Sequence, residues 1–112
     1  MLKTRSEGPI EVVALSGDID SSATPVLRNE LTDLVDSGNP LLILNLSKVR
    51  FVDSSALFLF VTLLKRCRAV GGDIALVGPN PTVRSIIQLT RLHRVLGVFE
   101  DEALAIGRMM PN

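Results

Sequence analysis

The stretch Leu41-Leu42-Ile43-Leu44-Asn45-Leu46 decides the fold, because five of its six residues are large and aliphatic. A strand with one face in water alternates apolar and polar residues, whereas a strand covered on both faces is apolar almost throughout. The run therefore predicts the central strand of a sheet that carries helices on its faces.

Shorter apolar segments on both sides of this run predict the remaining strands. Residues 10–15 are mostly apolar and β-branched, and Ser16-Gly17-Asp18 follows them, which predicts a strand that ends in a loop. A partner strand is expected just before it, across a turn at Glu7-Gly8-Pro9. The predicted strands are residues 2–6, 10–15, 41–46, 73–77 and 98–99.

Helical periodicity appears between these strands. Thr24 is the expected N-cap of the first helix, because Pro25 follows it and proline suits the first helical position. A second helix is expected over residues 54–70 before Gly71-Gly72, and a third over residues 81–91. The acidic run 100–102 predicts the start of a C-terminal helix with apolar positions Ala103, Leu104, Ile106 and Met110.

Alternating strands and helices of this kind predict an α/β fold. We expect a single-layer mixed β-sheet of four to five strands packed with about four α-helices. At 112 residues and 46% hydrophobic composition, the chain is expected to form one domain, residues 1–112.

Composition excludes several classes of function. Lysine plus arginine equals aspartate plus glutamate at 12 each, so no overall field attracts nucleic acid or an anionic membrane. The longest apolar run, residues 56–61, is too short to span a bilayer, and the N-terminus lacks an apolar signal core. Cys67 is the single cysteine and is expected in the core. These features predict a cytoplasmic protein without membrane insertion.

The segment Asp53-Ser54-Ser55 carries the strongest functional signal. An acidic residue and two hydroxyls stand immediately before an apolar helical run, which is the pattern of a helix N-terminus. A serine there is either a simple cap or a site for an added phosphate, which backbone N–H groups and the helix dipole favour.

Helix geometry places the other side chains of this second helix. At about 100° per residue, one broad stripe is expected to face the core, namely Ala56, Leu57, Phe60, Val61, Leu64 and Cys67. Ser55, Phe58, Leu59 and Thr62 stand at spacings that make neighbours on a helix surface. We therefore expect an outward apolar patch beside the Ser55 hydroxyl, with another element covering Phe58 and Leu59 as the alternative.

The order of elements, the loop Gly17-Asp18-Ile19-Asp20 and the helix opening Asp53-Ser54-Ser55 resemble the STAS domain of bacterial anti-sigma-factor antagonists. The resemblance covers nearly the whole chain. It implies that an anti-sigma factor, a serine kinase that binds ATP, phosphorylates Ser55 and that the unmodified antagonist binds this kinase and releases its sigma factor. A serine phosphatase is a further implied partner.

The resemblance also implies a partner-binding surface. Its expected residues are Asp20, Ser21, Asp53, Ser54, Phe58, Leu59 and Thr62. The family motif continues as Gly-Leu-Gly, whereas this chain has Ala56 and Phe58 in place of the glycines. Relatives of the same fold act as non-switching scaffold subunits of sensory complexes or as subunits of lipid-transport ABC complexes, which is the alternative function.

Enzyme chemistry is not indicated. His93 is the single histidine, and the chain has neither a Gly-x-Ser-x-Gly motif nor a Gly-rich nucleotide loop, so no catalytic residue, metal ligand or cofactor is expected. His93 and three arginines, Arg84, Arg91 and Arg94, form a modest basic cluster that we interpret as solvated, without direct nucleic-acid contact.

Overall fold

The computed structural model describes residues 2–110 and shows one sheet with helices on both faces. Along the chain the elements are β1 Leu2–Glu7, β2 Ile10–Ile19, α1 Thr24–Asp36, β3 Leu41–Val52, α2 Ser54–Ala69, β4 Asp73–Val77, α3 Pro81–Leu89, a 3-10 turn Leu92–Arg94, β5 Gly97–Phe99 and α4 Glu102–Met109. The strands lie in the order β1-β2-β3-β4-β5, and only the β1–β2 pair is antiparallel. The predicted fold class is therefore confirmed.

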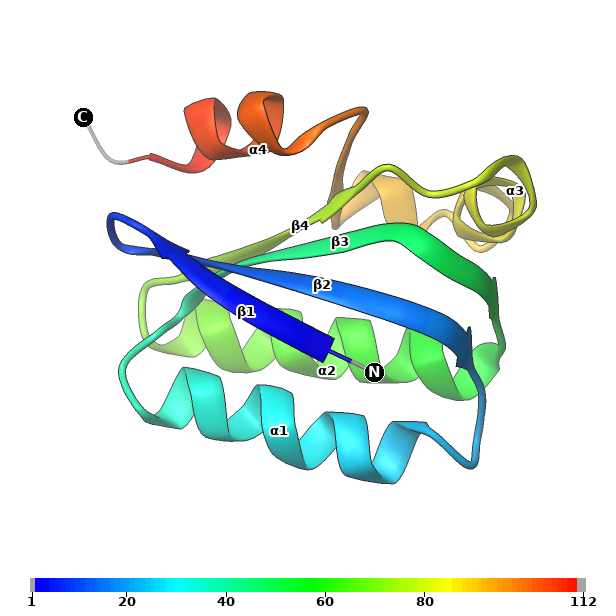
Figure 1. Cartoon of the computed structure of the whole chain (residues 1–112), viewed down its shortest axis with the longest axis horizontal. Coiled ribbons are helices and arrows are strands. Elements are labelled where there is room, and N and C mark those ends of the chain that lie inside the picture. The colour runs from blue at the N-terminus through cyan, green and yellow to red at the C-terminus, as the bar shows by residue number, and fades with distance from the viewer. Residues whose placement is uncertain (1, 111–112) are drawn as a thin grey trace.

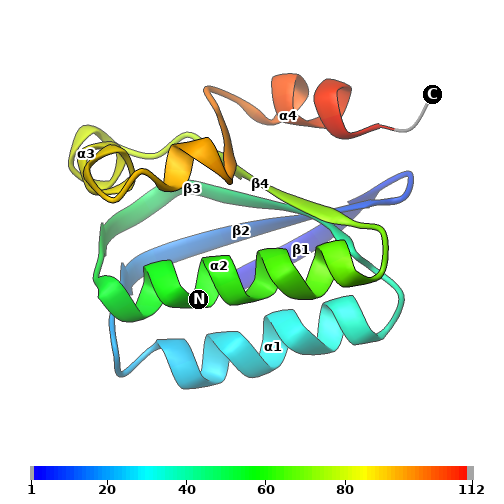
Figure 2. The same cartoon turned by 180° about the vertical axis from the view of Figure 1, so that it is seen from behind.

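Helices α1 and α2 lie side by side on one face of the sheet, and α4 lies on the opposite face (Figures 1 and 2). The larger core fills the space between the sheet and α1 and α2, with Phe60 as its largest fully buried side chain. A smaller core, which includes Ile10, Ile43 and Ala105, lies under α4. Cys67 is buried as expected, and burial raises the pKa of its thiol to about 11.

Strand β3 is the central strand, as its sequence predicted. Leu42, Leu44 and Leu46 contribute to the larger core, whereas Ile43 contributes to the smaller one, so both faces of the strand are covered. The strand is longer than predicted and continues to Val52, because it stays hydrogen-bonded beside β2 after the apolar run has ended. Its end therefore leads directly into the start of α2.

The expected loop at residues 16–18 is wrong, because β2 continues through it to Ile19. Gly17 has a φ of +86°, a backbone conformation that glycine adopts without strain, and the register with β3 shifts on both sides of it. The polar and glycine residues thus mark an irregular strand rather than its end. The extra length carries the chain to Asp20, beside the start of α2.

Helix α3 packs on the larger core through Val83 and Ile87, and the side chain of Asn80 also bonds it to the far end of β3. Asn80 caps α3 by accepting a hydrogen bond from the Val83 N–H, and its amide group donates to the carbonyl oxygens of Val49 and Arg50. These carbonyls belong to the end of β3, so the cap also ties the helix to the strand that leads into α2.

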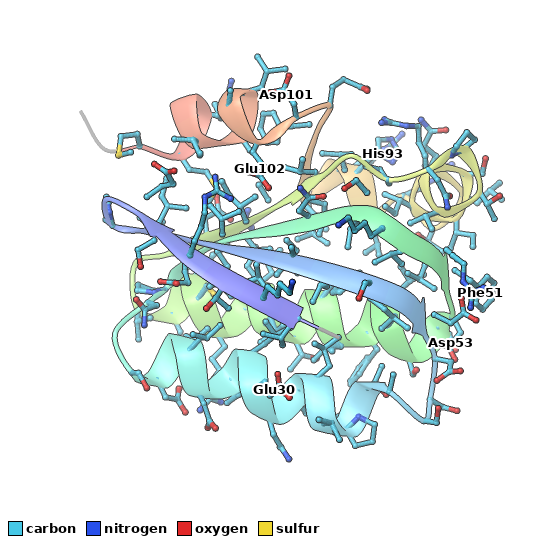
Figure 3. The ribbon with its side chains drawn as sticks, in the orientation of Figure 1. Glu30, Phe51, Asp53, His93, Asp101 and Glu102 are labelled. Atoms are coloured by element: carbon cyan, nitrogen blue, oxygen red, sulfur yellow. The ribbon has the colours of Figure 1, made fainter. Side chains whose placement is uncertain are left out.

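The apolar face predicted for α4 is partly wrong. Ala103, Leu104 and Met110 are exposed, whereas Ala105 is buried and Ile106 and Met109 pack against the smaller core. Glu102 adds a polar contact between the first turn of α4 and the sheet. Glu102 accepts a hydrogen bond from the Asn45 amide at 2.6 Å and forms an ion pair with Arg5 at 2.8 Å. Figure 3 shows Glu102 between α4 and the sheet.

The same contacts lower the pKa of Glu102 below its usual value of 4.5, chiefly through the Asn45 hydrogen bond and then the Arg5 hydrogen bond. A carboxyl whose pKa is lowered by folding contributes stability above its ordinary pKa and loses it as the pH falls through the lowered value. We therefore expect Glu102→Gln to lower the free energy of unfolding at neutral pH by about 1 kcal/mol and to flatten its fall with acidification below pH 4.5.

Urea unfolding at a series of pH values measures both effects. Glu30→Gln is the matched control, because Glu30 is an exposed residue of α1, far from α4 (Figure 3). If the free energy of unfolding falls as steeply with decreasing pH in Glu102→Gln as in the unaltered protein, the contacts of Glu102 do not stabilise the fold.

Candidate functional site

The candidate site lies where two strand ends meet two helix starts. Strand β2 ends at Ile19, just before Asp20, and β3 ends at Val52, just before Asp53, and the two strands run parallel. Their carboxyl ends therefore lie side by side at one edge of the sheet, where α1 and α2 begin (Figures 1 and 3). Two acidic residues distant in sequence are thus brought together.

Asp53 is the structural centre of this site. One oxygen of its carboxylate, Oδ1, accepts hydrogen bonds from the N–H groups of Ser55 and Ala56 and from the Ser55 hydroxyl, the last at 2.5 Å. The other oxygen, Oδ2, accepts the N–H of Ser21 from the loop after β2 at 3.0 Å. One carboxylate therefore caps α2, orients the Ser55 hydroxyl and fastens the neighbouring loop.

The two carboxylates of the site are both held ionised. The Ser55 hydroxyl, followed by the backbone N–H groups, lowers the pKa of Asp53, although partial burial opposes this effect. The Ser22 hydroxyl and the Ala23 N–H lower the pKa of Asp20, against a small opposing effect of the Asp53 charge. At neutral pH the Ser55 hydroxyl thus bonds an ionised carboxylate that has a second negative charge near it.

The prediction that Thr24 caps α1 is wrong. Ala23 occupies the N-cap position without a side-chain bond, and Asp20 instead orders the turn that leads into the helix, with its backbone carbonyl accepting the Thr24 N–H. Its carboxylate accepts from the N–H and hydroxyl of Ser22 and from the Ala23 N–H. An aspartate two residues before a serine favours such a local turn, so the sequence carried this signal.

Thr24 has a different place, which the sequence did not indicate. Its side chain is only 2% exposed, and its hydroxyl donates to the Ser55 Oγ at 3.4 Å. The contact joins residues 31 positions apart on two helices, so no local sequence pattern predicts it. Thr24 supports the Ser55 hydroxyl from the buried side.

Ser55 itself is half-buried, with Asp53 on one side and Thr24 on the other. Ser54, Phe58 and Thr62 are exposed on the outer surface of α2, and the Phe58 side chain is 69% exposed. An exposed aromatic ring therefore follows Ser55 by three residues, at a spacing that makes helix neighbours.

Leu59 does not belong to the predicted outward patch. It is 1% exposed because α1 packs against α2 and widens the buried stripe toward that side, while Val61, predicted to face the core, is half-buried. Ala56 is fully buried, so its methyl group is not presented to a partner. Of the two positions that depart from the family glycines, only Phe58 alters the surface.

The remaining candidate residues do not join this site. His93 and Arg94 lie in the exposed 3-10 turn, and Arg84 pairs with Glu100 at 3.0 Å. Within residues 2–110, no group of three His, Cys, Asp or Glu side chains is arranged to hold a metal ion. No helix in the described part of the chain combines the length and the apolar character needed to cross a membrane.

Comparison with known proteins assigns the chain to a family. The model of the STAS domain matches residues 2–105, so the chain belongs to the STAS domain family. A relative from Lysinibacillus sphaericus, an anti-sigma F factor antagonist, is 30% identical over 90% of this chain and 88% of its own length.

Solved structures show the same fold. The anti-sigma factor antagonist of Mycobacterium paratuberculosis superposes with a TM-score of 0.90 at 23% identity, over 99% of this chain and 94% of that one. The anti-sigma factor antagonist SpoIIAA in its unphosphorylated form gives 0.83 at 26% identity, over 96% and 95% of the two chains. The phosphorylated form of Bacillus SpoIIAA gives 0.74 at 25% identity, over 96% and 98%.

The cap at the start of α2 leads to a specific prediction. Asp53→Ala removes every acceptor of the cap, so we expect amide hydrogen exchange at Ser55 and Ala56 to accelerate by on the order of ten-fold. Asp53→Asn keeps one side-chain oxygen and is expected to change exchange much less, as asparagine is an equally good N-cap. Exchange followed by NMR measures both, and equal protection in all three proteins would contradict the assignment of Asp53 as the cap.

Proposed function

We propose that this protein is an anti-sigma-factor antagonist that binds an anti-sigma factor and is released when Ser55 is phosphorylated. The observation that carries the proposal is the setting of the Ser55 hydroxyl, which is held by Asp53 at the protein surface within one helical turn of the exposed Phe58. The relative from Lysinibacillus sphaericus and SpoIIAA, both anti-sigma factor antagonists, support the class of partner.

The contacts of Ser55 suit a phosphoryl acceptor. Asp53 accepts the hydroxyl hydrogen, and of the two lone pairs on the Ser55 oxygen the Thr24 hydroxyl engages one and leaves the other for a phosphoryl group. The chain has no Gly-rich phosphate loop, so the kinase partner supplies ATP and this protein supplies the acceptor. It works as a regulatory binding protein and not as an enzyme.

A phosphate on Ser55 acts mainly on the partner. It adds about −1.5 to −2 charges beside Asp53 and Asp20, which are already ionised. The N–H groups of Ser55 and Ala56 are bonded to Asp53, so they are not free to neutralise the new charge. A partner surface seated on Phe58 would have to desolvate this charge cluster, which weakens binding.

The fold itself has little reason to change. Ser55 is half-buried in the first turn of α2, and the α2 residues that belong to the larger core start one position further on, at Ala56. We therefore place the switch at the surface, in the cytoplasm, with residues 1–112 acting as one unit, and with a serine phosphatase restoring the unmodified form.

The partner-binding surface that we propose consists of residues on three segments. The loop after β2 contributes Asp20 and Ser21, the cap contributes Asp53 and Ser54, and the outer face of α2 contributes Phe58 and Thr62. The buried Leu59 supports this surface from within rather than contacting a partner.

Phosphate transfer provides the test of the acceptor. Incubation with ATP and the anti-sigma factor kinase of the same organism is expected to place about one phosphate per chain on Ser55, located by peptide mass spectrometry. Ser55→Ala should abolish the label. Ser54→Ala is the matched control, because Ser54 is the exposed neighbouring hydroxyl and should leave the label in place. Label on Ser54, or stable complex formation without label, would refute Ser55 as the switch.

A non-switching scaffold subunit is the second candidate, and Phe58 is the observation that favours it. A ring exposed by 69% on a helix surface is typical of an interface anchor, whether or not a switch accompanies it. Under this alternative Ser55 serves only within the cap of α2.

The role of Phe58 is tested by truncation. Phe58→Ala is expected to weaken binding of the anti-sigma factor by about 1–3 kcal/mol, because an interface anchor is lost, while stability changes little. Val70→Ala on the far end of α2 is the matched control, since Val70 is 63% exposed. Isothermal titration calorimetry gives both affinities, and unchanged binding in Phe58→Ala would place the ring outside the interface.

A further inference from the structure

A groove on the opposite face of the sheet is not used by the proposed switch. It encloses about 480 Å³ between α4 and the edge formed by β4 and β5, a size within the usual range for small-molecule sites. Four apolar side chains of the smaller core line it, namely Leu41, Ala75, Phe99 and Met109. The Ser55 site lies at the other end of the parallel strands, on the face covered by α1 and α2.

The groove exists because two elements are short. Strand β5 pairs only with Ala75, Leu76 and Val77 of β4, so Asp73 and Ile74 have no neighbouring strand on that side. At Gly97 the Phe99 ring fills the space that a side chain would need, because a Cβ at this residue would lie 2.9 Å from the ring. Helix α4 ends at Met109 and buries only Ala105 fully, so it covers the groove incompletely.

The free edge of β4 at Asp73 and Ile74 does not favour the binding of an extended peptide as an added strand. The Ile74 N–H, which an added strand would need, donates to the Asp73 carboxylate at 2.9 Å. The same carboxylate lies 3.4 Å from Arg68 Nε, so its charge is also partly compensated. The Ile74 N–H is therefore not free to pair with an added strand. A ligand in the groove would be bound by apolar contacts and by the remaining charge at its mouth.

That remaining charge is Arg108. It lines the groove from the last turn of α4 and is exposed, and no carboxylate of residues 2–110 is within ion-pair distance of it. A groove lined by four apolar side chains, with a guanidinium at its mouth that no carboxylate of the described residues neutralises, is complementary to a molecule with a hydrocarbon body and one anionic end, since guanidinium groups bind carboxylates well. Met109 adds an adaptable wall that suits a flexible chain.

We propose that this groove binds a linear aliphatic carboxylate, with its chain over Ala75, Phe99 and Met109 and its carboxylate on Arg108. The site is independent of Ser55 and of the proposed switch. With this site the protein would act as a carrier or sensor of a medium-chain acid. The ligand would lie on the α4 face of the sheet, so the partner-binding surface would stay free.

Titration of the ¹⁵N-labelled protein with decanoate tests the proposal. Saturable amide shifts are expected at Ile74, Gly97 and Met109 and not along the outer face of α2. Decanol serves as the neutral probe of equal chain length. Arg108→Gln should weaken decanoate binding by about five-fold, the upper range for an exposed ion pair, and leave decanol binding unchanged. Arg28→Gln is the matched control, because Arg28 is an exposed arginine on α1, across the sheet.

A second variant fills the groove. Gly97→Ile places a β-branched side chain in an edge strand, where such residues fit, and directs it against Phe99, so both probes should lose binding. Thermal unfolding of this variant confirms that it folds, and the Arg108→Gln comparison stands by itself if it does not. No saturable decanoate shift, equal affinity of decanoate for Arg108→Gln and the unaltered protein, or shifts centred on α2 would each overturn the proposal.

Discussion

The carboxylate of Asp53 is the interaction on which the rest of the site depends. It accepts the first N–H groups of α2, the Ser55 hydroxyl and the N–H of Ser21, so a single group joins a helix, a side chain and a loop from another part of the chain. These bonds form at the surface, where water competes, and they persist as a set because the parallel ends of β2 and β3 bring their partners together. Without this anchor, the Ser55 hydroxyl would keep only its longer contact with Thr24.

The central sheet and the helix order were predictable because they depend on apolar residues with a clear period. The apolar run that begins at Leu41 predicted the central strand, and the acidic and hydroxyl residues at 53–55 predicted the start of α2. The prediction failed where polar and glycine residues continue a strand, as at Ser16 and Gly17, or where a polar contact distant in sequence helps to hold a helix on the sheet, as at Glu102. Such features depend on partners far away in sequence, which no local pattern encodes.

The candidate site shows the same division. Ser55, Phe58 and Thr62 were placed by helix spacing alone, and their exposure agrees with it. Leu59 was misplaced because the width of the buried stripe depends on α1, a neighbour that the α2 sequence does not reveal. Thr24 and Ser21 were brought to Ser55 and Asp53 by the pairing of β2 with β3, so only the tertiary structure could assign their contacts.

The two faces of the sheet thus offer different chemistry. One end of the α1 and α2 face presents a fixed hydroxyl, two ionised carboxylates and an exposed ring, whereas the α4 face presents a groove lined by apolar side chains and by the exposed Arg108. The central claim is that a charge at Ser55 acts on the partner and leaves the fold intact. The most direct measurement compares the affinity of the anti-sigma factor for unmodified protein and for protein carrying phosphoserine at position 55, together with their melting temperatures. The account predicts affinity lower by at least about ten-fold with nearly equal melting temperatures, and equal affinities, or a large loss of stability in the modified protein, would contradict it.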